Sequence, residues 1–311
     1  MPGPYAHITL LHELIRPAGS KAVCKLSSRV DAVLATHFSF CALGAVSPDY
    51  PNLVRDKSGA SPWADAMHYV RACEMIASGI RRVRAAEGAV RDKQLAWLLG
   101  YSAHVATDVT IHPVVQARVG VYAENRREHR ICEMNQDSYI FRRMNLGEIG
   151  ASDHYAVSVK GCSAPGDKNR LDHDIVALWQ GMLADVHPEL FAAQPPDPAL
   201  WHREFVARAG GGAAGQARLF PLADVIAVEM ELAYPAYVAV DRAFIEAQAV
   251  PAAIPFRLHY DEIFDRAAAN TASLWNRVEQ AADEDAADPP LFGDWNLDNG
   301  RDEHGRLVFW E

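Results

Sequence analysis

Cysteine is scarce in this sequence, and long apolar runs are missing from it. The cysteines are odd in number and widely spaced, without a Cys-x-x-Cys pair, at Cys24, Cys41, Cys73, Cys132 and Cys162. This spacing indicates reduced thiols rather than a disulfide framework. No uncharged apolar run reaches the roughly 18 residues of a membrane span, and the start, Met-Pro-Gly-Pro-Tyr-Ala-His, lacks the basic and apolar regions of a secretory signal. We therefore expect a cytoplasmic protein without a transmembrane segment.

The sequence also lacks internal repeats and any sustained alternation of apolar and polar residues. Such alternation is the signature of a half-buried strand, so its absence argues against a β-rich fold. The 311 residues are 50% hydrophobic and 23% charged, with a formal net charge of −10, as in ordinary globular proteins. The negative balance argues against nucleic acid as a partner, because phosphate binding depends on cations. No pattern in the sequence indicates an oligomeric state.

Helical periodicity recurs along the chain and predicts an all-α fold, a compact multi-helix bundle. We expect helices at 5–15, 28–43, 61–86, 91–112, 124–146, 171–186, 198–208, 217–248 and 258–285. Residues 147–169 are rich in glycine and predict a loop, and Gly44 fits the position that follows a helix end. We expect residues 1–285 to form a single helical domain, with residues 286–311 as an extended tail packed on it.

Residues 98–113 carry three polar side chains in an apolar setting, namely His104, Asp108 and His112. Each four-residue step turns a helical side chain by only about 40°, so the three lie on one stripe of the helix. The leucine, valine and isoleucine residues around them place this helix in the interior. Pro113 disfavours helical geometry at the residue before it, so we expect the helix to end at residue 111 or 112.

Burying a carboxylate between two imidazoles is costly unless something pairs with them, and a metal ion is the obvious partner. A lone buried histidine is more often a satisfied core residue, but three aligned nitrogen and oxygen donors favour metal binding. His104 and His112 are about 12 Å apart along the helix axis, too far for both to bind one ion at about 2 Å. If both are ligands, at least two ions bind, with Asp108 between them.

The other candidate ligands are His7, Asp49, His68, His129 and Glu133. Asp49 lies in a turn between two prolines, where an aspartate is commonly turn chemistry alone. His129 and Glu133 are four residues apart on one helix face, and a surface pair is the simpler explanation of that spacing. Nitrogen and oxygen donors without cysteine suit zinc, although manganese or iron would also accept them.

Taken in chain order, these residues resemble the zinc-dependent phospholipase C family, which is similar in fold to the S1/P1-type nucleases. Five local strings carry the resemblance: Tyr5-Ala-His-Ile, Gly44-Ala-Val-Ser-Pro-Asp-Tyr-Pro, His68, His104-x-x-x-Asp108 followed by His112, and His129-x-x-x-Glu133. They match the family's first-helix histidine, turn aspartate, next histidine, central helix motif and closing pair. The resemblance covers about residues 1–140.

The resemblance implies a phospholipase C/P1 nuclease-like helical bundle that binds two or three zinc ions and hydrolyses phosphoester bonds. Carried over by position, the implied zinc groups are Asp49, His68, His104 and Asp108 for the first ion, His112, His129 and Glu133 for the second, and His7 with the bridging Asp108 for the third. Metal-activated water would attack a phosphodiester in a phospholipid or a smaller phosphoester. Asp49 could also serve as the general base.

The chain departs from the family pattern in three places. In secreted members, an N-terminal Trp completes the third zinc site through its amino group and carbonyl, whereas this chain begins Met-Pro-Gly-Pro and has no Trp near His7. We expect that site to be weaker, differently completed or empty. The interval from His104 to His112 is shorter than usual. The helical pattern of residues 217–285 implies that the membrane-docking β-sandwich of the toxin members is absent.

Three other functions are compatible with the sequence. A single-strand nuclease of the S1/P1 type would use a similar metal site, although the net charge of −10 counts against it. His173-Asp174 prompts an HD-type phosphohydrolase, but an aspartate is expected at such a helix start in any case. A relative with structural metals, acting as a binding protein or in a biosynthetic pathway, would keep the fold without this chemistry.

Overall fold

The computed structural model describes residues 3–15, 26–54, 59–151, 154–210, 218–251, 256–283 and 293–310, and thus not Cys24. Its α-helices are α1 (Pro4–Leu14), α2 (Ser28–Gly44), α3 (Ser61–Tyr69), α4 (Ala72–Ala85), α5 (Gly88–Val119), α6 (Arg126–Phe141), α7 (His154–Lys160), α8 (His173–Val186), α9 (Pro188–Ala193), α10 (Pro198–Gly210), α11 (Pro221–Met230) and α12 (Tyr260–Asp283). Short 3₁₀ helices are η1 (Ser47–Leu53), η2 (Arg142–Met144), η3 (Tyr237–Ala239) and η4 (Arg242–Phe244).

Strands are a minor part of the described chain. Antiparallel pairs form between β1 (Ser163–Ala164) and β2 (Asp167–Leu171), and between β3 (Gln248–Ala249) and β4 (Arg257–Leu258). The described residues form no β-sandwich, and the prediction of an all-α fold is confirmed. Among the described helices, none alone is both long and apolar enough to cross a bilayer, while α2 and η1, bent by 49°, meet that test only as a pair.

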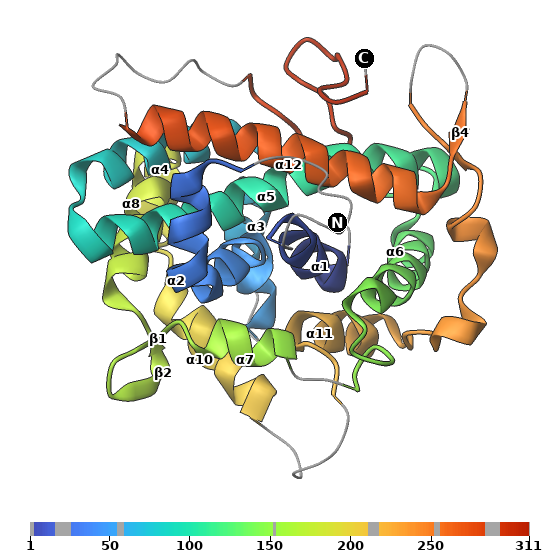
Figure 1. Cartoon of the computed structure of the whole chain (residues 1–311), viewed down its shortest axis with the longest axis horizontal. Helices are drawn as coiled ribbons and strands as arrows, with labels where there is room; N and C mark the ends of the chain where they lie inside the picture. Colours follow the sequence, from blue (N-terminus) through green and yellow to red (C-terminus); the bar gives the residue numbers. More distant parts are fainter. Residues whose placement is uncertain are drawn as a thin grey trace.

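Helix α5 lies at the centre of the fold, with α12 across one side of it and α1, α2 and α4 around it (Figure 1). Its side chains are buried from Gln94 to Val115, which confirms that this helix is interior. Helix α2 crosses it closely because two glycines meet at the crossing. A Cβ on Gly100 would lie 1.9 Å from the carbonyl oxygen of Cys41, and a Cβ on Gly44 would lie 2.0 Å from that of Trp97.

Gly44 therefore has a different role from the predicted one. It is the last residue of α2, and the following Ala45 keeps right-handed helical geometry, so Gly44 does not provide a left-handed helix end. Its missing side chain allows α2 to approach α5, and this contact sets the position of the turn η1 that follows. That turn carries Asp49, and the crossing consequently brings Asp49 toward the middle of α5.

The prediction that the central helix ends at residue 111 or 112 is wrong, because α5 continues through Pro113 to Val119. Proline removes one helical hydrogen bond and crowds the carbonyl four residues earlier, here that of Val109. The chain from residue 293 onward packs over this irregular turn. A Cβ on Gly300 would lie 2.6 Å from the Val109 oxygen, and the Trp310 indole donates to the Thr110 carbonyl at 2.8 Å. These contacts help α5 to continue where its local sequence favours a stop.

The single helix predicted over residues 61–86 is two helices. Val70 is extended and Arg71 adopts the left-handed region with φ 54°, which separates α3 from α4. A left-handed non-glycine residue is uncommon, and periodicity alone did not indicate it. The break leaves His68 in the last turn of α3, where it turns toward α5.

Two other predicted segments differ from the structure. Residues 147–169 contain α7 and the β1–β2 hairpin, whose turn at Pro165 and Gly166 (φ 83°) uses the common Pro-Gly turn chemistry. The helix expected at 217–248 stops at Met230, where the following Glu231 adopts the left-handed region with φ 51°. The short helix α9 was not predicted. By contrast, α8, α10 and α12 fall close to their expected ranges.

Candidate metal centre

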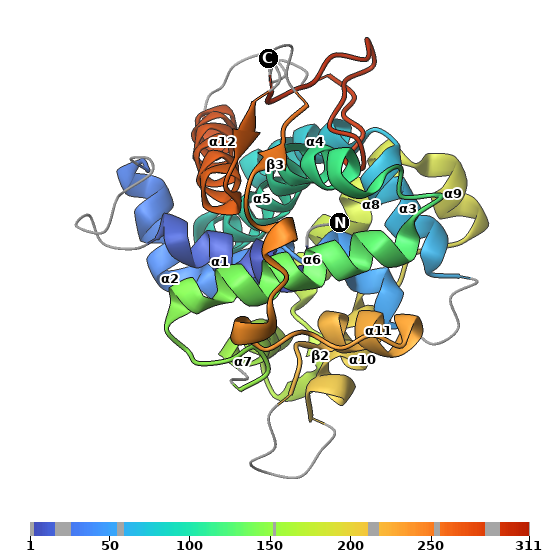
Figure 2. The same ribbon diagram turned by 90° about the vertical axis from the view of Figure 1, so that its right-hand side faces the viewer.

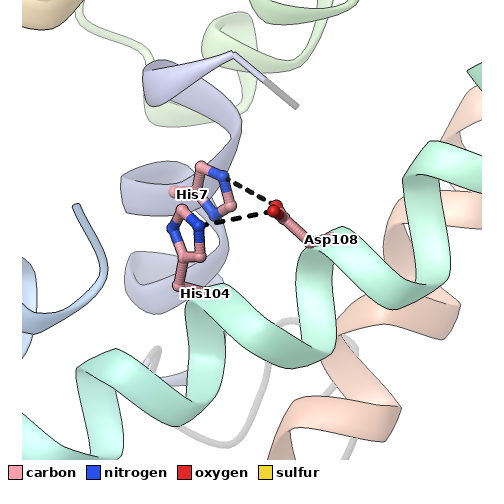
Figure 3. Close-up of side chains that lie close together, drawn as sticks. All are labelled: His7, His104 and Asp108. Carbon is pink, nitrogen blue, oxygen red and sulfur yellow. Dashed lines mark ion pairs between the residues drawn. The ribbon is translucent and has the colours of Figure 1, made fainter. Parts of the chain in front are cut away.

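Helices α1 and α5 bring three of the predicted donors together at their crossing. His7 Nε2 lies 3.2 Å from Asp108 Oδ1, and His104 Nε2 lies 3.3 Å from Asp108 Oδ2. Figure 3 shows both imidazoles beside the carboxylate, and the two rings stack with their centroids 4.2 Å apart. One ligand atom from each residue lies within 4.8 Å of the other two, and all three residues are buried. This spacing is short enough for one ion to contact all three.

His68 and Asp49 extend the group from the end of α3 and from η1. His68 Nε2 lies 3.2 Å from His104 Nε2, 3.7 Å from Asp49 Oδ1 and 3.9 Å from Asp108 Oδ2. Asp49 is 5% exposed and His68 4%. The Asp49 carboxylate thus faces the interior, which a purely surface turn would not require.

His112 contacts Asp108 from the next turn of α5, and His129 and Glu133 form a pair on α6. His112 Nδ1 is 3.9 Å from Asp108 Oδ2, and His129 Nδ1 is 3.9 Å from Glu133 Oε1. All three residues are at most 2% exposed, so the simpler explanation of His129 and Glu133 as a surface pair is wrong. Asp108 thus contacts His104 one turn before it and His112 one turn after it, and a second group of His112, His129 and Glu133 stays a prediction.

Four of the five histidines share one feature: a ring nitrogen lies at hydrogen-bond distance from a backbone carbonyl. The pairs are His68 Nδ1 with Ala64 (2.7 Å), His104 Nδ1 with Ala45 (2.9 Å), His112 Nδ1 with Leu297 (2.5 Å) and His129 Nε2 with Gly120 (2.6 Å). An N–H donated to a carbonyl fixes the tautomer and leaves the other nitrogen as a base. Histidines that bind metals are commonly oriented in this way.

The donor atoms that make no hydrogen bond provide the test of metal binding. Among the eight predicted ligands, the buried polar atoms without a hydrogen-bond partner in the described part of the chain are His7 Nδ1 and Nε2, Asp49 Oδ1, Asp108 Oδ1 and Oδ2, His112 Nε2 and His129 Nδ1. Buried polar atoms are normally satisfied, and leaving one without a partner costs about 1–3 kcal/mol. Such a concentration of bare donors fits a cation.

The nitrogens of His68 and His104 give a second fit to zinc. With both Nδ1 atoms protonated, their Nε2 lone pairs face each other across 3.2 Å. This contact is repulsive without a cation or an extra proton. Two nitrogens bound tetrahedrally to one zinc at about 2.0–2.1 Å are about 3.3 Å apart, so the separation of these donors suits that ion.

Burial and neighbouring charge set the protonation of the group. Burial, reinforced by His104, lowers the pKa of His7 to about 4 and that of His68 to about 3, so both imidazoles are neutral near pH 7. Burial raises the pKa of Asp49 to about 6. Burial alone would raise the pKa of Asp108, but His104 and the other nearby imidazoles hold it well below its usual range. Neutral imidazoles and an ionised carboxylate are the forms that bind metals.

A cavity of about 940 Å³ reaches the group at Asp49 and His68. Elements α3, α9 and α11 contribute to its wall, and Figure 2 shows them on one side of the molecule. The apolar part of the wall on α11 consists of Leu222, Val225, Ile226 and Met230. Arg126 and Arg130 line the same cavity. The pocket therefore combines an apolar face with positive charge beside the buried donors.

Sequence reasoning missed three residues near the group. Arg130 is buried and pairs with Glu133, its Nη1 lying 2.8 Å from Oε2, and it donates to the Tyr122 hydroxyl. The many arginines around it suggested a solvated surface. Leu297 reaches His112 through its carbonyl, and Asp298 lines the cavity. A backbone acceptor far along the chain leaves no pattern in the sequence.

A second cluster with suitable residue types is formed by Asp172, His173 and Asp174 at the start of α8. Here the carboxylates have partners. Lys93 Nζ lies 2.7 Å from both, and Asp172 caps α8 by accepting from the Asp174 and Ile175 amides. The side chain of His173 is 77% exposed. Helix capping and one lysine account for this cluster, and it gives no support to an HD-type phosphohydrolase.

Comparison with known proteins gives one match. A family model described as zinc-dependent phospholipase C matches residues 6–189, more than half of the 311 residues. The chain belongs to the zinc-dependent phospholipase C family. No curated protein and no solved structure gives a match. The matched range includes all eight predicted ligands and extends beyond residue 140, and it ends before α10.

Membership of the zinc-dependent phospholipase C family accounts for the chemistry of the donors. Nitrogen and carboxylate ligands are typical of zinc, and the triad of His7, His104 and Asp108 fits that ion. The number of ions and the ligands of each stay predictions. Of the segments outside the family match, α11 supplies an apolar wall of the cavity and the tail supplies the carbonyl partner of His112.

Proposed function

We propose that the protein is a multi-zinc hydrolase of phosphodiesters, with a phospholipid or a smaller phosphoester as substrate. One observation carries this proposal. Buried donor atoms without hydrogen-bond partners gather in one place, and two residues of that group, Asp49 and His68, also line a cavity with an apolar wall. A structural metal would not need such access. The family match supports the same class of reaction.

The donor groups suggest how zinc would be held. The proposed sets are Asp49, His68, His104 and Asp108 for one ion, His112, His129 and Glu133 for another, and His7 with Asp108 for a third. The chemistry that zinc supplies when bound is Lewis acidity toward water and phosphate oxygens. The carbonyl partners of the histidines would hold the rings in place before substrate arrives.

Asp49 is the residue proposed to move a proton. It lines the cavity, and its Oδ1 lacks a hydrogen-bond partner among the described residues. A carboxylate oxygen that faces the cavity is placed to accept a proton from a water there. Asp49 would accept the proton of the attacking water, while the apolar wall on α11 would hold the alcohol portion of the ester.

The test is hydrolysis by zinc-loaded protein of p-nitrophenyl phosphorylcholine, bis-p-nitrophenyl phosphate and phospholipid micelles, beside single-stranded DNA. We expect turnover of at least one phosphodiester, loss of turnover on chelation and recovery with zinc. Cleavage of DNA alone would instead support the S1/P1-type nuclease. Stoichiometric zinc without hydrolysis of any ester would overturn the proposal and support structural metals in a binding protein.

A further inference from the structure

The tail beyond the family match contacts the metal centre at Leu297. Its amide donates to the carbonyl of His68 at 3.1 Å, and its carbonyl accepts from His112 Nδ1 at 2.5 Å. The break after α3 exposes the His68 carbonyl, because the carbonyl of a residue in a helix's last turn receives no N–H from the following turn. Leu297 thus links two histidines from different helices, and its position fixes that of the next residue.

Asp298 follows Leu297 and lines the same cavity as Asp49 and His68. Its backbone is held by the Asn296 side chain, which accepts from the Asp298 amide at 3.0 Å. The carboxylate itself is poorly satisfied. The amide of Gln116 lies 3.5 Å from Oδ2, and no lysine or arginine among the described residues pairs with it.

The cavity places this carboxylate close to the predicted ligands. Asp298 lines it together with Asp49, His68 and Arg130, and Arg130 is bonded to Glu133. A carboxylate held in such a space with only a long contact to an amide is costly unless a cation pairs with it. The group also contains His112, which is 2% exposed and whose Nε2 has no hydrogen-bond partner among the described residues. Both observations favour a cation beside Asp298 and His112.

We propose that Asp298 is a metal ligand, which joins His112, His129 and Glu133 as the fourth protein donor to one ion. This inference rests on the proposed zinc centre. Three donors leave one position of a tetrahedral site free, and the hydrogen bond between Leu297 and His112 places the next residue, Asp298, beside this histidine. The tail therefore completes the coordination from outside the segment that carries the family pattern.

The test compares Asp298→Asn with Asp302→Asn, a control in the same tail. Within the described part of the chain, the Asp302 carboxylate accepts from His304 and Arg306, both in the tail, so Asp302→Asn perturbs the tail without removing a carboxylate from the centre. Zinc content by ICP-MS and affinity by chelator competition are the readouts. We expect Asp298→Asn to lose one zinc or to bind it about 10–100-fold more weakly, with Asp302→Asn close to wild type.

A thermal melt separates ligation from simple tail packing. In metal-free protein, Asp298→Asn should melt at or above the wild-type temperature, because a repelling charge is removed, and with zinc it should melt lower. Equal zinc affinity in wild type and Asp298→Asn, or equal losses in both variants, would overturn the inference while leaving the hydrolase proposal intact. Absence of stoichiometric zinc in wild type would overturn both.

Discussion

The chain holds two clusters of metal-binding residue types, and their difference is instructive. Around Asp108, both oxygens of that residue, Asp49 Oδ1 and ring nitrogens of His7, His112 and His129 are buried without a hydrogen-bond partner among the described residues, whereas Asp172 and Asp174 are bonded to Lys93 and to helix amides. The residue types alone do not distinguish the two clusters. The unsatisfied atoms do, because buried polar atoms normally have partners and a group of neighbouring ones without partners favours a ligand.

The largest expected effect is that of Asp108→Asn. An amide in place of the carboxylate removes the charge shared by both donor groups, so at least one zinc should be lost from each chain by ICP-MS. Hydrolysis should fall by more than the roughly 10–100-fold typical of residues that only support ligands. Asp174→Asn is the matched control, for which zinc content should stay at the wild-type value. Equal zinc in the two variants would show that the distinction between the clusters is false.

Lys93→Met should lower the free energy of unfolding and leave the zinc content unchanged. It leaves the Asp172 and Asp174 carboxylates, whose side chains are 7% and 15% exposed, without their cation. Breaking a fully buried pair costs about 3–5 kcal/mol, and for this partly exposed one we expect about 1–3 kcal/mol of unfolding free energy. Urea denaturation measures it. Zinc content should not change, and a loss of zinc would mean that the α8 cluster contributes to binding.

Asp137 offers an intermediate case, a carboxylate that is fully buried but hydrogen-bonded. It accepts from the amides of Tyr5 and Ala6 and from the Tyr234 hydroxyl, and burial raises its pKa to about 8. From about pH 4, the pKa of an aspartate in the unfolded state, to about pH 8, Asp137 is protonated in the folded state and ionised in the unfolded state. The contribution of this protonation to the free energy of unfolding is therefore full below about pH 4 and is lost as the pH rises through 8. The free energy of unfolding falls by at most about 1.4 kcal/mol per pH unit in this range.

Asp137→Asn should remove this slope. Denaturation of metal-free protein at pH 5, 6, 7 and 8 would measure it as a difference between wild type and variant. We expect the variant to gain stability relative to wild type as the pH rises. A constant difference across this range would mean that hydrogen bonds from the start of α1 keep Asp137 ionised.

The smallest effect belongs to His173→Ala. The side chain is 77% exposed, and its contact with Asp174 is 3.0 Å, so the change in unfolding free energy should stay within about 0.5 kcal/mol. Zinc binding should be unaltered. Thermal denaturation and ICP-MS on the same sample check both expectations. A measurable drop in zinc would reopen the α8 cluster as a binding site.

Local pattern predicted those parts of the fold and site that depend on neighbours in the chain. The stripe of His104, Asp108 and His112, the interior position of their helix and the order of the other candidates follow from helical geometry and motif. The position of His68 does not, because it depends on a left-handed residue at Arg71. Helix propensity also failed at Pro113, where packing from the distant tail outweighs a local preference for a stop.

The contacts of the tail with α5 have a consequence for how the protein folds. The hydrogen bond from His112 to Leu297 spans 185 residues, and that from Trp310 to Thr110 spans 200, whereas bonds within α5 span four. Closing large loops carries an entropic cost that local helix formation avoids. Helicity should therefore recover early in refolding and zinc affinity late, so metal uptake reports the arrival of the native topology rather than of secondary structure.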